Sequence, residues 1–441
     1  MNYIKKNMKG ITLISLVITI ILLLILAGIS IRSIVGSNGI LKTAQKATKD
    51  YENDQTDEKE YIDSLEDDTE ENTENLPENT PENPQEVGER VALKEEWKSE
   101  KKSTVYAVSI GDGETIPVPK RFFYVGGNFR TGVIISDNEQ DKYEEGKDKT
   151  TYEYTTKLKG NQFVWIPCTE TEYKKCDSWN GTTQTDTILG DCVWDKNTPD
   201  SELVQIKKYG GFYIARYEAG LANTIKEFTT NQKHTCLNSV YNKDGVPQSK
   251  AGMVPWMYID WTQSKANAEK MYNNIYVNSG LVTGTQWDVI LNKMLSENAI
   301  KASDLTASEN LGNYADNIIP YTGRLARADY NVTNSKAWTL KPFGPITTGQ
   351  TSSYTKNNGD LLTTGASDIA QRYHIFDFAG NLWEWTDEED TYNNDTKKQY
   401  RMTRGGSYNN QSSSMCVCYR AGSGVINYTG FSTRISCGTL Y

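Results

Sequence analysis

The sequence predicts an α+β fold for most of the chain: a loop-rich domain with small sheets and two helices, preceded by one membrane helix and a disordered acidic linker. Three observations support this prediction. The run Ile11–Ile31 contains no charged residue, residues 51–90 are dominated by acidic side chains, and the rest is rich in Gly, Asn, Ser, Thr and Tyr with short β-type runs.

The first element is a single N-terminal transmembrane helix. An uncharged apolar run such as Ile11–Ile31 is long enough to cross a bilayer as a helix. Lys5, Lys6 and Lys9 precede it, and positive charge before such a segment tends to stay in the cytoplasm. We therefore expect a single-pass protein of the cell membrane whose C-terminal domain is extracellular.

The residues before this helix resemble a type IV prepilin leader, in the segment Gly10-Ile-Thr-Leu-Ile-Ser15. The resemblance implies a leader over residues 1–10, cleavage between Gly10 and Ile11 by a prepilin peptidase, a pilin-like helix over residues 11–50, and pilin-like assembly partners. Ser15 stands where that family usually carries a glutamate that helps subunits assemble. The alternative is a plain anchor that is never cut.

An acidic linker follows over residues 51–100. Between Tyr51 and Arg90 there are 16 acidic and two basic residues, with several prolines and few large apolar side chains. Such a stretch cannot bury enough surface to offset its ordering entropy, so we expect a disordered spacer. Since the whole chain has a net charge of −10, the remainder is close to balanced at about +4 and does not suggest a nucleic-acid partner.

Residues 101–160 form a small strand-rich segment in this prediction. Its β-type runs are separated by Gly and Pro turns and comprise Thr104–Ser109, Phe122–Val125 and Thr131–Ser136. Residues 161–441 form the main domain. Two helices are expected there: Gln263–Tyr276, capped by Thr262, and Gln286–Leu295, capped by Thr285.

Several motifs of the main domain resemble the formylglycine-generating enzyme (sulfatase-modifying factor) family, whose fold is C-type-lectin-like. They are Phe163-Val-Trp-Ile-Pro167, Gly211-Phe-Tyr-Ile-Ala-Arg-Tyr-Glu218, Leu281-Val-Thr-Gly-Thr-Gln-Trp-Asp288, Tyr373-His-Ile-Phe-Asp-Phe-Ala-Gly-Asn-Leu-Trp-Glu-Trp-Thr386, Arg404-Gly-Gly-Ser-Tyr408, Tyr419-Arg-Ala-Gly422 and Gly430-Phe-Ser-Thr-Arg-Ile435. The resemblance covers residues 160–435. We expect Trp165, Trp287, Trp383 and Trp385 to be core residues.

The enzymes of this family use two cysteines that bind copper and activate oxygen. The matching positions here are Asn410 and Met415, and the nearby Cys416 and Cys418 are weak catalytic candidates that are out of register. A CxC pair can still hold Cu(I), because thiolates are soft ligands. The alternative is a pair of structural cysteines. Of the two histidines, His374 adjoins a core motif and is expected to be packed and hydrogen-bonded.

The family resemblance also implies a Ca²⁺ site. Carried over to this sequence, the ligands are the side chains of Asp377 and Glu384 and the main-chain carbonyls of Gly380 and Leu382. Calcium accepts many oxygen ligands in flexible geometry, which suits such a set. The alternative is that Glu384 caps backbone amides in a loop without metal.

The late loops of a lectin-like fold form its binding surface, which here is Tyr408–Tyr428. Tyrosine mixed with Ser, Gly and Asn is the composition of antibody loops, and this region also looks like the variable region of proteins diversified by retroelements. The expected ligand-binding residues are Tyr408, Asn409, Asn410, Ser412, Tyr419, Asn427 and Tyr428. The alternative is a tolerant exposed loop without a ligand.

These patterns favour a cell-surface-anchored, non-catalytic ligand-binding protein, adhesin-like or receptor-like, with an extracellular protein or glycan as its ligand. Two alternatives stay open. One is a copper-dependent oxidase of the formylglycine-generating type that acts on protein cysteine, and copper is expected only in that case. The other is a structural minor pilin.

Overall fold

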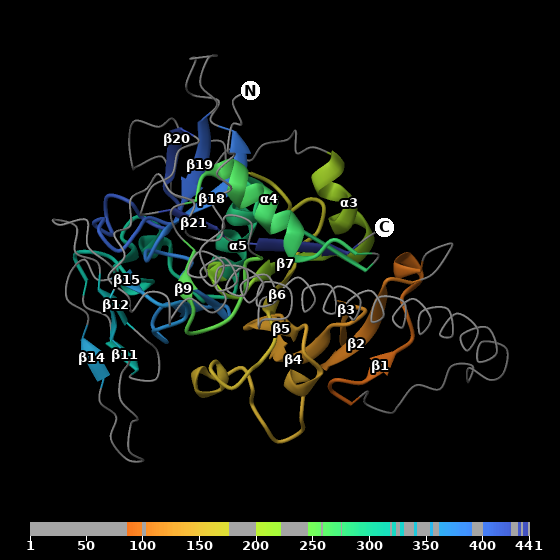
Figure 1. The fold of residues 1–441 in the computed structure, drawn as a ribbon. Helices are drawn as coiled ribbons and strands as arrows, with labels where there is room; N and C mark the ends of the chain where they lie inside the picture. The colour runs from red at the N-terminus through yellow and green to blue at the C-terminus, as the bar shows by residue number, and fades with distance from the viewer. Residues whose placement is uncertain are drawn as a thin grey trace, which may run out of the picture. The chain divides into compact units, whose positions relative to one another are not determined.

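Six antiparallel strands form the central sheet of the computed structural model (Figure 1). In spatial order they are β10 (Val277–Leu281), β22 (Ile435–Thr439), β7 (Gly211–Ala215), β6 (Gln162–Pro167), β5 (Gly132–Ser136) and β4 (Phe123–Asn128). The last strand of the chain, β22, lies between β10 and β7. The C-terminal end is therefore an integral part of the sheet.

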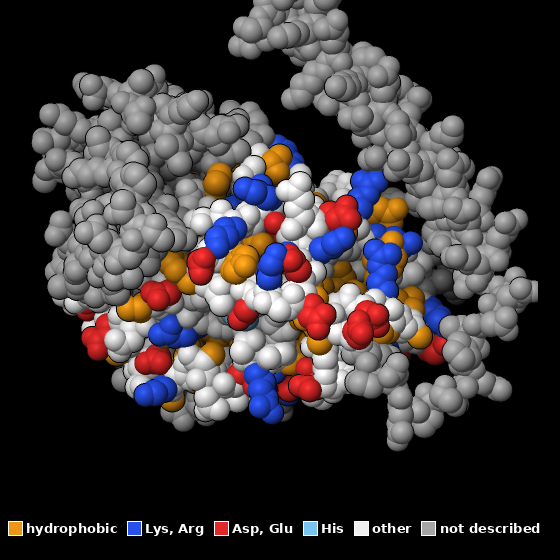
Figure 2. Space-filling model, turned by 90° about the horizontal axis from the view of Figure 1, so that it is seen from below, with side chains coloured by type: hydrophobic (Ala, Val, Ile, Leu, Met, Phe, Trp, Pro, Cys, Tyr) orange, Lys and Arg blue, Asp and Glu red, His pale blue; other side chains and the backbone are white. Residues whose placement is uncertain are grey.

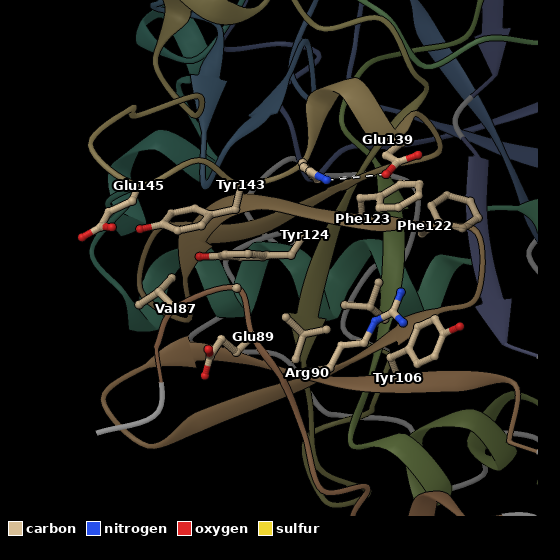
Figure 3. Close-up of a pocket in the computed structure, with 14 residues that line it drawn as sticks. Val87, Glu89, Arg90, Tyr106, Phe122, Phe123, Tyr124, Glu139, Tyr143 and Glu145 are labelled. Atoms are coloured by element: carbon tan, nitrogen blue, oxygen red, sulfur yellow. Dashed lines mark hydrogen bonds and ion pairs between the residues drawn. The ribbon is translucent and has the colours of Figure 1, made fainter. Parts of the chain in front are cut away.

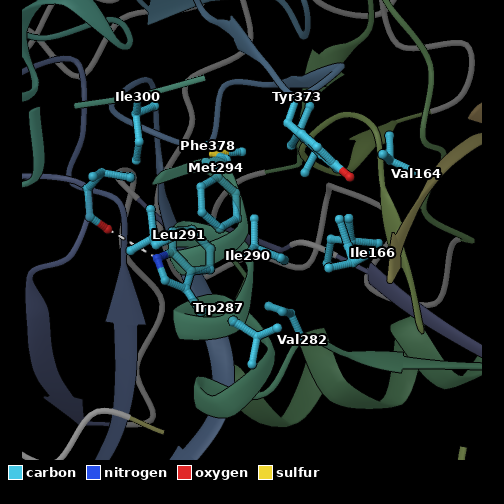
Figure 4. Packing of buried hydrophobic residues seen from close by; sticks show 14 of the residues in the cluster. Val164, Ile166, Val282, Trp287, Ile290, Leu291, Met294, Ile300, Tyr373 and Phe378 are labelled. Atoms are coloured by element: carbon cyan, nitrogen blue, oxygen red, sulfur yellow. Dashed lines mark hydrogen bonds between the residues drawn. The ribbon is translucent and has the colours of Figure 1, made fainter. Parts of the chain in front are cut away.

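Both faces of this sheet are covered by hydrophobic clusters. Successive side chains of a strand point to opposite faces, so neighbouring residues belong to different clusters. In β6, Val164 and Ile166 belong to one hydrophobic cluster, while Phe163 and Trp165 belong to a second. The first cluster also contains Trp287 (Figure 4). The four tryptophans that the sequence places in the core, Trp165, Trp287, Trp383 and Trp385, are at most 7% exposed, which confirms that prediction.

A three-stranded sheet of β1 (Arg90–Val91), β2 (Val105–Gly111) and β3 (Glu114–Pro119) supplies side chains to the second cluster. Runs predicted near β2, β4 and β5 are confirmed as strands. The strand β3 was not predicted, since Pro117 and Pro119 argue against a strand. It pairs only with β2 within the described residues, and proline is tolerated in such an edge position.

Three α-helices occur among the described residues: α3 (Asp200–Tyr209), α4 (Trp261–Met271) and α5 (Gly284–Ser296). The two expected helices are confirmed as α4 and α5, but their predicted caps are wrong. The predicted end of the first helix at Tyr276 is also wrong, because α4 ends at Met271 and the backbone is already extended at Tyr272. The side chains of Asp260 and Thr283 accept hydrogen bonds from the N–H groups three residues later and complete capping boxes. The expectation of two helices is also wrong, because α3 is a third helix, in a segment where no helix was expected.

A second, four-stranded sheet has the order β20 (Arg420–Gly424), β19 (Tyr400–Arg404), β18 (Trp383–Glu389) and β21 (Phe431–Thr433). The pairing of β18 with β21 is parallel and the other pairings are antiparallel. The remaining strands are β8 (Gly220–Leu221), β9 (Val254–Pro255), β11 (Pro320–Thr322), β12 (Arg327–Asp329), β13 (Thr339–Lys341), β14 (Ser353–Thr355), β15 (Leu361–Leu362), β16 (Gln371–Arg372) and β17 (Ile375–Phe376). The fold is thus a loop-rich α+β domain with small sheets.

The structure describes residues 86–98, 103–175, 200–221, 246–256, 259–274, 276–317, 320–322, 327–329, 339–341, 353–355, 361–389, 400–424, 431–433 and 435–439. They belong to one unit, Asn83–Tyr441, called the head below. The predicted leader, membrane helix and most of the acidic linker lie outside the described residues. Within those residues, no helix has the length and apolar character needed to span a membrane.

Candidate functional site

The loop from Asp377 to Glu384 is held in an unusual backbone conformation. Asp377, Gly380 and Asn381 have positive φ angles of 53°, 70° and 57°. A Cβ atom on Gly380 would lie 2.3 Å from the carbonyl oxygen of Asn313, so glycine is required for this close approach. The loop is therefore pressed against the segment that contains Asn313.

Buried hydrogen bonds of Asn381 fix this conformation. Its side-chain oxygen accepts from the Leu362 N–H at 3.0 Å and from Asn313 Nδ2 at 2.8 Å. Its side-chain nitrogen donates to the Leu362 carbonyl at 3.1 Å and to the Glu218 carboxylate. The Gly-Asn pair of the motif thus builds the loop and leaves the neighbouring carboxylates in set positions.

The carboxylates expected to bind calcium are both buried, with Asp377 4% and Glu384 1% exposed. Asp377 Oδ2 accepts a hydrogen bond from the Gly365 N–H at 2.6 Å, so one of its two carboxylate oxygens is bonded to the main chain. The Tyr217 hydroxyl is buried without a hydrogen-bond partner among the described residues. Burial, with a smaller contribution from the charge of Asp377, raises the Tyr217 pKa to about 12.

These residues fit a hard cation in chemical type. Two buried carboxylates need compensating positive charge or hydrogen bonds, and carboxylate and carbonyl oxygens are the ligands that calcium accepts. The buried Tyr217 hydroxyl is a further oxygen, close enough to Asp377 for the charge of that carboxylate to raise its pKa. In the described part of the chain, however, no three His, Cys, Asp or Glu side chains gather as a metal cluster. A cation here would therefore rely on main-chain oxygens as well.

Two carboxylates and two guanidinium groups form a buried cluster at the second sheet, and the partly exposed Lys175 contacts its Glu388 at 3.0 Å. Arg404 contacts Asp288 at 2.5 Å and Glu388 at 3.3 Å. Arg420 contacts Glu388 at 3.1 Å and also pairs with Asp288. All four side chains are at most 4% exposed. Each charge is therefore compensated where water cannot reach it.

Electrostatics explain why this cluster stays ionised. The charges of Arg420, Arg404 and Lys175 outweigh the burial of Glu388 and lower its pKa to about 2. Helix α5 supplies Asp288, and strands β18, β19 and β20 supply the other three members. Sequence reasoning missed this cluster. The signal was present, because Asp288, Arg404 and Arg420 each belong to a different family motif.

The segment Ser407–Tyr419, which includes most of the expected ligand-binding residues, is fastened to the head at several points. The Tyr408 N–H donates to the Asn381 carbonyl at 2.9 Å, and the Ala315 N–H donates to the Asn410 carbonyl at 2.8 Å. The Ser412 N–H and hydroxyl both donate to the Asp316 carboxylate. These contacts come from separate parts of the chain, so they restrain the segment along its length.

The expected ligand-binding residues differ in exposure. Tyr408 and Ser412 are each 1% exposed and pack inside the head, so neither presents its side chain to a partner. Asn409 is exposed, and Asn410 and Tyr419 are partly buried. Asn427 and Tyr428 lie outside the described residues. Two further exposed side chains of the segment, Gln411 and Ser413, were not among the expected residues.

The two candidate catalytic cysteines lie deep in the core. Cys416 and Cys418 are 0% and 3% exposed, and their sulfur atoms are 3.6 Å apart, a contact and not a bond. Cys418 also donates to the Leu305 carbonyl at 2.9 Å. The positions that match the family's copper cysteines, Asn410 and Met415, are partly buried. The structure thus brings the two thiols together, but beneath the surface.

His374 is packed and hydrogen-bonded, as expected. Its Nδ1 lies 2.8 Å from the Gly132 carbonyl, which can only accept, so Nδ1 carries the proton. Burial, and then the nearby charge of Arg216, lower the His374 pKa to about 4. The imidazole is therefore neutral at physiological pH.

The chain is similar to one protein family and to solved structures. The family described as the sulfatase-modifying factor enzyme 1-like domain matches residues 112–431. No curated protein matches the sequence. Among solved structures, the crystal structure of CarF is similar with 12% identity and a TM-score of 0.30, covering 52% of this chain and 87% of that one. Treponema denticola variable protein 1 is similar with 13% identity and a TM-score of 0.30, covering 63% and 96% respectively.

The family match begins within the three-stranded sheet and ends in β21, so it includes every strand of the central sheet except β22, both capped helices and the ionic cluster. It covers well over half of the chain. The Gly380–Asn381 loop and all four members of the cluster lie within the matched residues. The chain therefore belongs to the sulfatase-modifying factor enzyme 1-like family.

Proposed function

We propose that this chain is a non-catalytic ligand-binding protein, held at the cell surface by its N-terminal helix, whose extracellular ligand is a protein or a glycan. The observation that carries the proposal is the contrast within Ser407–Tyr419. Its backbone is fastened to the head by contacts of Tyr408, Asn410 and Ser412, while the side chains of Asn409, Gln411 and Ser413 are exposed.

Such a segment suits recognition for an energetic reason. Binding by a mobile loop loses conformational entropy when the loop is ordered, whereas a segment already restrained loses less. Exposed Asn, Gln and Ser side chains supply both donors and acceptors, which match protein backbones and glycan hydroxyls. Figure 2 shows basic and acidic side chains interspersed on one face of the described part.

The cell-surface part of the proposal rests on the uncharged run Ile11–Ile31 and the lysines before it. Cleavage after Gly10 and assembly with pilin-like partners are proposed on the prepilin-like leader. A minor pilin without its own ligand is the alternative, and it predicts that changes in the exposed residues of Ser407–Tyr419 have no effect on capture.

The oxidase alternative is disfavoured by burial. A protein cysteine cannot approach Cys416 or Cys418 without displacing the core that covers them, since the two side chains are 0% and 3% exposed. Asn410 and Met415 lack the thiolate that the family's enzymes use for copper. The observation in favour of the alternative is the 3.6 Å separation of the two sulfur atoms.

The proposal is tested by displaying the full chain on bacterial cells and measuring their capture on arrays of immobilised glycans and extracellular matrix proteins. A triple variant, Asn409→Ala, Gln411→Ala and Ser413→Ala, removes the exposed polar side chains. We expect it to reduce capture about tenfold or more, because a few central residues carry most binding energy. The same variant should unfold close to the wild-type temperature, since exposed side chains contribute little to stability. The Ser407 hydroxyl, which donates to Asn409 Oδ1, retains Asn410 Oδ1 at 2.6 Å as an acceptor.

The matched control changes three exposed residues of helix α4: Thr262→Ala, Glu269→Ala and Lys270→Ala. This variant should capture as the wild type does. Equal capture by both triple variants, or oxidation of a cysteine-containing peptide by the wild-type chain with added copper and oxygen, contradicts the proposal.

A further inference from the structure

A cavity of about 450 Å³ lies far along the chain from the C-terminal segment, between the three-stranded sheet and the start of the central sheet (Figure 3). One wall consists of residues of β1, β2 and β3, and the other consists of β4 with the loop from Glu139 to Glu145. Five aromatic side chains face it: Tyr106, Phe122, Phe123, Tyr124 and Tyr143. This volume is within the usual range for small-molecule pockets, roughly 300 to 1,000 Å³.

The chain itself places cations over one of these rings. The guanidinium carbon of Arg90 is 3.5 Å from the ring centroid of Tyr106, and Lys120 Nζ is 5.4 Å from the same centroid. The electron-rich face of an aromatic ring attracts a cation within about 6 Å. At one end of the pocket, a cation–π contact is therefore already formed by the chain's own side chains.

The other end contains a pair of tyrosine rings, called the Tyr124–Tyr143 platform below, in which Tyr143 is partly exposed and Tyr124 is 6% exposed. The rings of Tyr124 and Tyr143 are 5.5 Å apart and inclined by 31°, and the Tyr124 hydroxyl donates to the Gly127 carbonyl at 2.9 Å. The Tyr143 ring packs against Gly88, where an added Cβ would lie 2.9 Å from Cδ1. Among the described residues, no Lys or Arg lies over either ring.

Charge at the rim favours a positive ligand. The lining has three carboxylates, Glu89, Glu139 and Glu145, against two basic side chains, Arg90 and Lys142. Lys142 is paired with Glu139 at 3.5 Å, and Arg90 lies over Tyr106 at the other end. Glu89 and Glu145 are exposed at the edge, and neither forms an ion pair with a described residue. Figure 3 shows Glu145 beside the Tyr143 ring and Glu89 on the facing wall. The free end of the pocket thus combines aromatic faces with uncompensated carboxylates.

The wall that carries Glu89 is held in place by main-chain bonds. The Gly88 N–H donates to the Ser109 carbonyl at 2.8 Å, and the Ser109 N–H donates to the Glu89 carbonyl at 2.9 Å. These bonds continue the β1–β2 ladder beyond the two residues of β1. The pocket is therefore formed by ordered backbone on both sides before a ligand arrives, which lowers the entropic cost of binding.

We propose that this pocket binds an organic cation, an ammonium or guanidinium group on a compact apolar body, with the charge over the Tyr124–Tyr143 platform and beside Glu89 and Glu145. The site is separate from the exposed residues of Ser407–Tyr419 and does not depend on the function proposed for them. An uncharged ligand of the same shape should bind less well, because it forgoes the attraction to the rings and carboxylates.

The test compares choline with 3,3-dimethylbutan-1-ol, its uncharged carbon isostere, by titration calorimetry and ligand-observed NMR on the purified full chain. Choline should bind about tenfold more tightly than the isostere, as expected for a cation–π contact supported by carboxylates. The variants Tyr143→Ala and Glu145→Gln should each weaken choline binding by about three- to tenfold. Raising the salt concentration should weaken choline binding and leave the isostere unaffected.

The matched control is Glu95→Gln, which removes the same charge from an exposed residue that pairs with Lys98 outside the pocket. It should bind choline as the wild type does. Thermal unfolding of every variant verifies that the head is folded. No choline binding at 10 mM, equal affinity for choline and the isostere, or equal losses in Glu145→Gln and Glu95→Gln would each overturn the proposal.

Discussion

The indole Nε1 of Trp287 donates a hydrogen bond to the main-chain carbonyl of Val417 at 3.1 Å (Figure 4). Trp287 is on helix α5, while Val417 lies in the C-terminal segment between the two buried thiols. The same indole stacks on Phe378 with ring centroids 3.9 Å apart. One side chain thus joins the helix, the Asp377–Glu384 loop region and the segment proposed to bind a ligand.

Replacing Trp287 by Phe should destabilise the head markedly. The substitution keeps an aromatic ring but leaves the buried Val417 carbonyl without this donor and removes part of a fully buried side chain. Loss of a buried hydrogen bond together with core volume is expected to lower the free energy of unfolding by about 2–4 kcal/mol. Urea denaturation of the full chain measures the difference.

Trp261→Phe is the matched control for this substitution. Trp261 Nε1 also donates to a main-chain carbonyl, that of Thr386 at 3.1 Å, but this indole is only partly buried. Water can replace part of the lost bond, so the expected cost is about 1 kcal/mol. Equal losses of unfolding free energy in the two variants would show that the Trp287–Val417 hydrogen bond stabilises the head no more than the partly exposed one.

The ionic cluster predicts a large difference between two neighbouring glutamates. Glu388→Gln leaves the buried Arg404 and Arg420 with a single carboxylate, so the free energy of unfolding should fall by about 3–5 kcal/mol. Glu389→Gln removes an exposed partner of Arg401 and should cost at most about 1 kcal/mol. Denaturation curves at pH 7 for both variants provide the comparison.

The stability contributed by the same cluster should also depend on pH in the acid range. The folded-state pKa of Glu388 is about 2, below its usual value near 4.5. Its contribution to the free energy of unfolding is therefore complete above pH 4.5 and is lost as the pH falls towards 2. The stability gap between wild type and Glu388→Gln should therefore narrow over this range. A constant gap down to pH 2 is inconsistent with an ionised Glu388 in the cluster.

The buried imidazole of His374 predicts pH dependence in a higher range. Its folded-state pKa of about 4 lies below the ordinary value of 6.5, so the unfolded chain binds a proton first as the pH falls. Stability is unaffected above pH 6.5 and decreases between 6.5 and 4, by up to about 3 kcal/mol for this residue. Unfolding curves at half-unit pH intervals measure the effect.

His374→Asn is suited to this test because His374 has a φ of 58°, a conformation that asparagine tolerates. The variant should lose the pH dependence between 6.5 and 4 while retaining stability at pH 7 within about 1–2 kcal/mol. If the variant and the wild type lose stability in parallel over that range, His374 is not the group responsible.

Calcium is proposed as a structural ion of the Asp377–Glu384 loop. A ligand that binds only the folded state stabilises it in proportion to the logarithm of its concentration over the dissociation constant. The unfolding temperature of the full chain should therefore fall by several degrees on chelation with EGTA and recover with added Ca²⁺. Glu384→Gln should abolish the response, whereas Glu389→Gln should retain it. An unfolding temperature that EGTA does not change contradicts the site.

The sequence predicted the parts of the fold that depend on local patterns. Helix α5 was recognisable because Trp287, Ile290, Leu291 and Met294 recur at helical spacing, and all four are buried. Its cap was placed two residues too late, because Thr283 and Thr285 are equally plausible by type. The reciprocal bonds between Thr283 and Gln286 decide between them.

Long-range pairing was beyond sequence reasoning. Arg404 and Asp288 are 116 positions apart, and no spacing rule brings them to 2.5 Å. The burial of Tyr408 was equally hidden, because a tyrosine beside Asn, Gln and Ser has the composition of an exposed loop. Of the residues that form the proposed cation pocket, Tyr106 and Tyr124 belong to predicted strand runs, whereas Glu89 falls in the predicted acidic linker. No local pattern joins them, since the cavity arises from the packing of β2 against β4.

Native mass spectrometry of the full chain with added Cu(I) and Ca²⁺ distinguishes a binding head from a copper oxidase. A binding head should hold one Ca²⁺ and show the same copper content in the wild type and in a Cys416→Ser, Cys418→Ser double variant. One stoichiometric Cu(I) that is present in the wild type and absent from the double variant would refute the binding head and favour the oxidase.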